Sequence, residues 1–156
     1  MTPGDLARLL GRLAPALEAL DEPWVFIGSA ALMILGLPLE DCADLDVLTT
    51  TTGAQRLERA WSAWRAADYG PDPAAPFRSR FSRYEVDEGA FEVMGDLKLR
   101  TPRGWRPVWP EAIERRAFRG GLWPIPTAAD QLRILRLFGR PKDLAKATWL
   151  ERWLTA

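Results

Sequence analysis

Two aspartates separated by one apolar residue, Asp44-Leu45-Asp46, are the residues of this sequence whose types and spacing best fit a chemical role. The run DLDVLT is typical of a strand, and side chains two apart in a strand project from the same face. Both carboxylates then point the same way, where they repel each other and lose hydration unless a cation lies between them. The spacing predicts a site for a hard divalent ion. The alternative is a loop-to-strand junction in which Asp44 caps a turn and Asp46 faces water.

A Gly-Ser pair follows an apolar strand-like run, in the sequence WVFIGS. Gly28 and Ser29 are followed by the apolar stretch AALMIL, which predicts a short buried helix. The start of a helix offers free backbone N–H groups and the positive end of the helix dipole, both suited to a phosphate. Ser29 is equally well placed to act as a simple N-cap, and one geometry serves both roles. Together with the aspartates, this turn predicts a site for a metal-bound nucleotide.

The order of these features resembles the nucleotidyltransferase superfamily, which includes DNA polymerase β. Its pattern is a strand, Gly-Gly or Gly-Ser, a short helix, and Asp-x-Asp on the next strand, with a third carboxylate on a later strand. Gly28-Ser29 and Asp44-Leu45-Asp46 match that pattern. The segment is also similar to the stand-alone bacterial branch, which contains small antibiotic nucleotidyltransferases and nucleotidyltransferase-like proteins of toxin–antitoxin systems.

The resemblance implies transfer of a nucleoside monophosphate from an NTP to a hydroxyl acceptor, with two Mg²⁺ or Mn²⁺ ions. Asp44 and Asp46 would bind the metals, and a third carboxylate would help to deprotonate the acceptor. Glu92 is our choice for that position, because it is polar within the apolar strand FEVM, and Asp96 is the alternative on the same strand face. Glu92 could equally be a solvent-facing residue of an edge strand. The acceptor (a small molecule, a protein or an RNA end) and the preferred NTP stay open.

The sequence departs from the family just before the aspartates. Stand-alone members usually have an arginine and a hydroxyl residue there, whereas this chain has Glu40-Asp41-Cys42-Ala43. The additional acidic residues strengthen cation binding but repel a triphosphate, unless basic residues from elsewhere in the chain lie close to the site. We expect one or two to do so from a set of seven: Arg78, Arg80, Lys98, Arg100, Arg133, Arg136 and Lys142. Two functions therefore stay open, an active Mg²⁺-dependent nucleotidyltransferase and a catalytically silent binding or regulatory module, such as a toxin–antitoxin component with a partner protein.

The surrounding elements predict an α/β (α+β) fold, with a small mixed sheet of the nucleotidyltransferase type flanked by helices and a helical C-terminal cap. Apolar periodicity and turn residues favour helices over 5–20, 29–35, 52–69, 110–116, 127–138 and 142–154, and strands over 24–27, 44–49, 77–86 and 91–99. Residues 101–108 read as irregular, and Gly120-Gly121 as a helix break or a hairpin turn. We interpret 1–156 as a single domain, with a core over 1–100 and an extension over 101–156.

The amino-acid composition excludes several kinds of active site and ligand. The chain has no histidine, which removes Ser-His-Asp and Cys-His nucleophilic sites and histidine-ligated zinc. Lys+Arg and Asp+Glu are balanced at 21 each, so no overall basic field favours duplex DNA. Cys42 is the only cysteine and reads as inert, and no apolar run approaches the roughly 20 residues of a membrane span. We expect a cytoplasmic protein.

Overall fold

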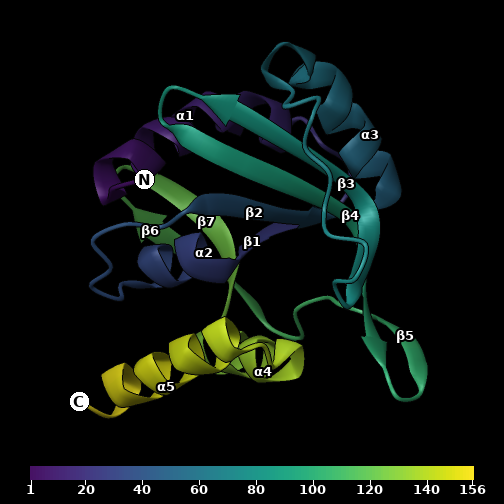
Figure 1. The fold of residues 1–156 in the computed structure, drawn as a ribbon. Helices are drawn as coiled ribbons and strands as arrows, with labels where there is room; N and C mark the ends of the chain where they lie inside the picture. Colours follow the sequence, from purple (N-terminus) through teal and green to yellow (C-terminus); the bar gives the residue numbers. More distant parts are fainter.

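The computed structural model describes residues 1–156, which form five α-helices, one 3-10 helix and seven strands (Figure 1). The helices are α1 (Pro3–Glu18), α2 (Gly28–Leu35), α3 (Thr51–Ala60), η1 (Ser62–Trp64), α4 (Ala128–Phe138) and α5 (Pro141–Thr155). The strands are β1 (Trp24–Ile27), β2 (Asp44–Thr49), β3 (Phe77–Val86), β4 (Gly89–Thr101), β5 (Gly104–Pro107), β6 (Ile113–Phe118) and β7 (Gly121–Pro126).

A five-stranded mixed sheet forms the centre of the fold. Its strand order is β1-β2-β4-β3, and β5 pairs with the far end of β4. The β2–β4 pair is parallel, whereas β1–β2 and β3–β4 are antiparallel. A separate two-stranded sheet is formed by β6 and β7. The predicted α+β fold with a mixed sheet is confirmed.

The two faces of the sheet have different partners. One face packs against α1 and α3, where the strand residues Leu45, Val47, Phe91 and Val93 join the leucines of α1 in the main core. The opposite face carries the even-numbered residues of β2, including the two aspartates. Helices α4 and α5 lie on that side of the molecule (Figure 1). The alternation of strand side chains thus directs the aspartates away from the main core and toward the C-terminal helices.

Two helix predictions are wrong. Residues 110–116 do not form a helix, because 113–118 pair with β7 in a hairpin whose turn residues Arg119 and Gly120 have φ of 42° and 89°. The Gly120-Gly121 alternative of a hairpin turn is therefore the one found. The helix expected over 52–69 ends at Ala60, where Trp61 turns into the core against Tyr84 and Phe91. In both places long-range packing outweighs local helix propensity.

Two strand boundaries also differ from the expected ones. The segment 101–108, expected to be irregular, contains β5, which pairs with the end of β4. Strand β4 consequently extends from Gly89 to Thr101.

None of the helices combines the length and the apolar character that crossing a bilayer requires.

Candidate functional site

Three neighbouring strands place charged side chains in a row on the α4–α5 side of the sheet. In the register of the sheet, Asp46 lies opposite Glu92 on β4, and Glu92 lies opposite Arg83 on β3. Side chains at paired positions of adjacent strands are neighbours on one face. Asp44 lies two residues before Asp46 and projects from the same face. The structure therefore brings together Asp44, Asp46 and Glu92, the three carboxylates proposed from the sequence.

We call Asp44, Asp46 and Glu92 the acidic group. The turn at Gly28 lies directly against it. Strand β1 leads into α2 at Gly28, whose φ is 75°, and Ile27 is paired with Asp46. A Cβ atom added to Gly28 would lie 2.7 Å from Oδ2 of Asp46. The helix start makes no side-chain capping hydrogen bond, so the simple N-cap role for Ser29 is not found. The first turn of α2 and the Asp46 carboxylate thus face the same space.

The carboxylates perturb one another strongly. Burial raises the pKa of Asp46 well above its usual value, and repulsion from Asp44 and Glu92 adds to the increase. Burial also raises the pKa of Glu92, and repulsion from Asp44 acts in the same direction. The ionised forms of Asp46 and Glu92 are therefore unfavourable in this site. A cation held among them would remove that cost.

One cation of the chain already lies among the carboxylates. Nη1 of Arg83 donates a hydrogen bond to Oε1 of Glu92 at 2.6 Å and to Oδ2 of Asp44 at 3.4 Å. The sequence pattern predicts Arg83 as an outward basic residue of its strand. Because its neighbours Ser82 and Tyr84 are buried in the core, alternation does turn Arg83 to the opposite face, but there its side chain contacts the carboxylates and is mostly shielded from solvent.

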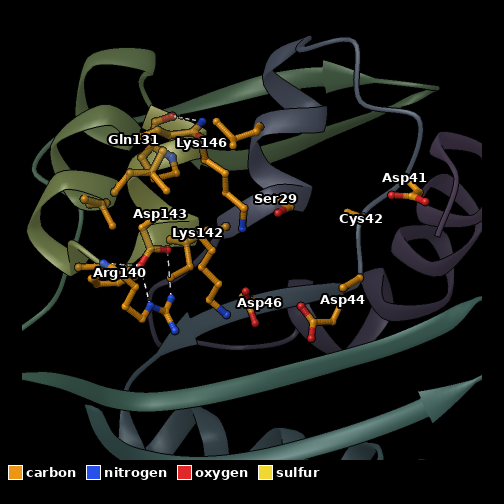
Figure 2. A pocket seen from close by; sticks show the side chains of 18 residues that line it. Ser29, Asp41, Cys42, Asp44, Asp46, Gln131, Arg140, Lys142, Asp143 and Lys146 are labelled. Carbon is orange, nitrogen blue, oxygen red and sulfur yellow. Dashed lines mark hydrogen bonds and ion pairs between the residues drawn. The ribbon is translucent and has the colours of Figure 1, made fainter. Parts of the chain in front are cut away.

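The donor set fits a divalent ion at two of the three carboxylates. No group of three or more Asp, Glu, Cys or His side chains converges as a metal site. Glu92 already accepts a hydrogen bond from Arg83. Asp44 and Asp46 remain side by side, as Figure 2 shows. Because Mg²⁺ commonly uses one or two carboxylates together with waters and phosphate oxygens, this pair suits one such ion.

Asp96 does not reach the acidic group. It has φ of 50°, and the pairing of β3 with β4 shifts register opposite it, between Arg78 and Arg80. Its carboxylate instead accepts hydrogen bonds from the backbone N and the hydroxyl of Thr51. These are groups at the start of α3. The irregularity breaks the strand alternation on which the same-face assignment of Asp96 depends, and that assignment is wrong.

Asp96→Ala is expected to lower the free energy of unfolding by about 1 kcal/mol, as loss of a helix-start acceptor does. The hydrogen bonds from the Thr51 side chain and backbone lower the pKa of Asp96. Its contribution is therefore present above the unfolded-state pKa of about 4 and is lost as the pH falls through the lowered native value. Urea unfolding at pH 7 and at pH 3 measures this. Asp96→Asn should lose less of the free energy of unfolding, because asparagine tolerates positive φ. A lower Mn²⁺ affinity in either variant would instead show that Asp96 is a metal ligand.

A cavity of about 390 Å³ opens between the acidic strand, the start of α2 and the C-terminal helices. Figure 2 shows Lys142 and Lys146 extending from α5 into this space toward Asp46 and Ser29. The charge of Lys146 is close enough to Asp46 to offset part of the increase in its pKa. Arg140, at the start of α5, also lines the cavity but is paired with Asp143 at 2.6 Å. The basic groups missing before β2 are thus supplied from the far end of the chain.

Of the seven basic candidates from the sequence, Lys142 lines this cavity and Arg78 a second one. Three others are paired elsewhere: Arg80 with Glu58, Arg133 with Asp130, and Arg136 with Glu151. Sequence reasoning missed Lys146 and the contact of Arg83 with the carboxylates. Lys142 and Lys146 are four residues apart on a predicted helix, and that shared face is the signal that could have found the pair.

The second cavity, of about 710 Å³, adjoins the first, and Asp44, Asp46, Arg140 and Lys142 line both. It extends along β3 and β4 and includes Glu92, whereas Ser29 and Lys146 line only the first cavity. Its wall combines aromatic side chains, among them Tyr69, Phe77 and Phe81, with the basic residues Arg78 and Arg140. The two aspartates therefore line both cavities, with the start of α2 on one side and the aromatic residues of β3 on the other.

The loop before β2 adds few charges to the site. Glu40 is exposed and Asp41 lies at the rim of the first cavity. Cys42 is buried, and burial raises the pKa of its thiol to about 11. The thiol is therefore protonated at neutral pH and is a poor nucleophile.

The fold is similar to those of solved nucleotidyltransferases. A Thermotoga maritima protein provisionally assigned as a nucleotidyltransferase superposes with a TM-score of 0.74, at 24% identity, over 99% of this chain and 96% of that one. The lincosamide antibiotic adenylyltransferase LnuA, in a lincomycin-bound structure, gives 0.61 at 12% identity over 97% of both chains. The antibiotic-resistance factor ANT(2'')-Ia gives 0.62 at 11% identity, over 100% of this chain and 86% of that one.

No family model matches the sequence, and no curated protein matches it. The structural similarity shows that this chain has the nucleotidyltransferase fold, as the resemblance of its Gly-Ser and Asp-x-Asp features predicts.

Proposed function

We propose that this protein binds a nucleoside triphosphate with a divalent cation and transfers its nucleoside monophosphate to a hydroxyl acceptor, releasing pyrophosphate. The observation that carries the proposal is the arrangement around the first cavity. There the start of α2, the pair Asp44 and Asp46, and two lysines of α5 face one space. Each of these features suits one part of a metal-bound triphosphate.

Asp44 and Asp46 would hold the divalent ion, Mg²⁺ or Mn²⁺. When bound, such an ion neutralises charge that develops on phosphoryl oxygens. The backbone N–H groups at the start of α2 would bind phosphate oxygens, since Gly28 has no side chain to block their approach. Lys142 and Lys146 would balance the remaining triphosphate charge and orient the leaving pyrophosphate.

The acceptor would lie in the second cavity, beside Glu92. Burial raises the pKa of Glu92, which makes its carboxylate a stronger base toward the acceptor hydroxyl. The aromatic side chains of the cavity wall suit apolar contact with a small molecule, and the charged residues beside them suit polar groups of the same molecule. The lincomycin-bound structure of LnuA supports a small-molecule acceptor in this fold.

A second function, a catalytically silent nucleotide-binding or regulatory module, is favoured by one observation. Glu92 is paired with Arg83, and no third carboxylate joins Asp44 and Asp46 as a ligand. Such a module would bind a metal-bound nucleotide and act through a partner protein, for instance within a toxin–antitoxin pair. Pyrophosphate release from each NTP, with Mg²⁺ and a panel of hydroxyl acceptors, separates the two functions. Binding without release under every condition would indicate the silent module.

Lys142→Ala together with Lys146→Ala is expected to weaken Mg²⁺–ATP binding by at least about a hundred-fold, since each charged hydrogen bond contributes roughly 1.5–3 kcal/mol. Isothermal titration calorimetry of the folded double variant measures the loss. Arg152→Gln is the matched control, because Arg152 is an exposed cation of the same helix away from the cavity. Unchanged affinity in the double variant would contradict the assignment of the triphosphate to the first cavity.

A further inference from the structure

Arg83 occupies an unusual position for a basic residue beside a proposed metal site. We infer that its guanidinium takes the place of one divalent ion, so that the site holds a single ion on Asp44 and Asp46 instead of two. The inference rests on the proposed function, because it concerns the metal content of the same site. It makes Arg83 a built-in cation of the nucleotide site.

The position of Arg83 is held from several directions. Its Nη1 lies 2.6 Å from Glu92 and 3.4 Å from Asp44, the contacts that a second ion would need. The guanidinium carbon lies 4.7 Å from the centre of the Tyr69 ring, and Nε lies 3.7 Å from Glu85. The Arg83 side chain is only 19% exposed and that of Glu92 only 13%. This is a partly buried, hydrogen-bonded pair, unlike exposed ion pairs such as Arg136–Glu151.

Backbone pairing also fixes the contact. Arg83 and Glu92 are direct cross-strand partners on β3 and β4, and Tyr84 and Phe91 stack at the adjacent pair with ring centroids 5.1 Å apart. The core on the other face of the sheet therefore sets the register that places Arg83 against Glu92. Moving the guanidinium out would leave the Glu92 carboxylate without its charged partner, which is costly in a partly buried site.

The charges are consistent with a single ion. One divalent ion together with the guanidinium already supplies as much positive charge as the three carboxylates Asp44, Asp46 and Glu92 supply negative charge, and Lys142 and Lys146 add further positive charge nearby. A second divalent ion added beside Arg83 would be repelled by the guanidinium and would find the Glu92 Oε1 already bonded. Removing the guanidinium frees two carboxylate oxygens, which are ligands that Mn²⁺ and Mg²⁺ prefer.

Counting bound Mn²⁺ tests this inference without a turnover assay. Mn²⁺ alone is titrated into the protein, and the electron paramagnetic resonance signal of the free ion gives the number bound. We expect one ion per chain for the wild type and two for Arg83→Met. Arg83→Met combined with Glu92→Gln should return to one. Arg80→Gln, which removes the same charge from the same strand at the Glu58 ion pair, should stay at one.

Two ions in the wild type would overturn the inference while leaving the proposed function intact. One ion in Arg83→Met would overturn it as well. No binding to either protein would overturn both the inference and the proposed metal site. Should Arg83→Met fail to fold, Arg83→Gln takes its place, with the same expected count of two. Mn²⁺ should also raise the melting temperature of the variant more than that of the wild type.

Discussion

Asp46→Asn is expected to abolish stabilisation by Mg²⁺ or Mn²⁺ and to lower nucleotidyl transfer by about a thousand-fold or more, while the apo protein becomes more stable. The metal ion supplies several kcal/mol of charge stabilisation in the transition state, and each 1.36 kcal/mol corresponds to about ten-fold in rate. Asparagine keeps the shape of the side chain and removes the charge. Its neighbours Asp44 and Glu92 then lose a source of repulsion.

The gain in apo stability should depend on pH in a defined direction. The pKa of Asp46 is raised in the native state, so the unfolded chain ionises first as the pH rises past about 4. The wild type therefore loses stability from that pH up to the raised native value and stays constant above it. The difference between the variant and the wild type should be small near pH 4 and large at pH 8. Glu92 contributes a slope of the same sign to both proteins.

Thermal unfolding across pH, with and without Mg²⁺, measures these effects. Asp68→Asn is the control, because Asp68 is an exposed carboxylate outside both cavities. Identical melting curves for the wild type and Asp46→Asn at every pH and metal concentration would leave the acidic pair without a role in cation binding.

Gly28→Ala is expected to abolish Mg²⁺–nucleotide binding and to lower the free energy of unfolding by about 1–2 kcal/mol, the usual cost of a side chain at positive φ. The φ of Gly28 is 75°, and the added Cβ would lie 2.7 Å from Oδ2 of Asp46. The carboxylate must then move away from the start of α2. Phosphate and metal would lose their shared geometry even though every charged residue is still present.

Calorimetric titration with Mg²⁺–ATP and urea unfolding measure the two effects. Gly11→Ala is the matched control, since Gly11 lies in α1 with nothing within 4 Å of an added Cβ. That change should raise stability by about 0.5–1 kcal/mol, because glycine is unfavourable within a helix. Normal nucleotide affinity in Gly28→Ala would show that the approach of Asp46 to this turn has no part in binding.

The sequence by itself determined the fold class and the position of the acidic pair. These follow from local rules: the alternation of DLDVLT directs Asp44 and Asp46 to one face, and the glycine after an apolar run ends β1 and begins α2. Alternation also places Glu92 on one face of β4. Its position opposite Asp46, however, results from parallel pairing of strands more than forty residues apart in the chain.

Only the tertiary structure decided which cations surround the carboxylates. Arg83 reaches Glu92 because Tyr84 is drawn into the core, and Lys146 reaches the site because α5 packs on the far side of the first cavity. Tertiary structure also determined the position of Asp96, because its strand loses its alternation at a register shift. It likewise determined β6, where pairing with β7 replaces a predicted helix. Hydrophobic burial and strand pairing act between distant segments, so no local pattern of residue types determines them.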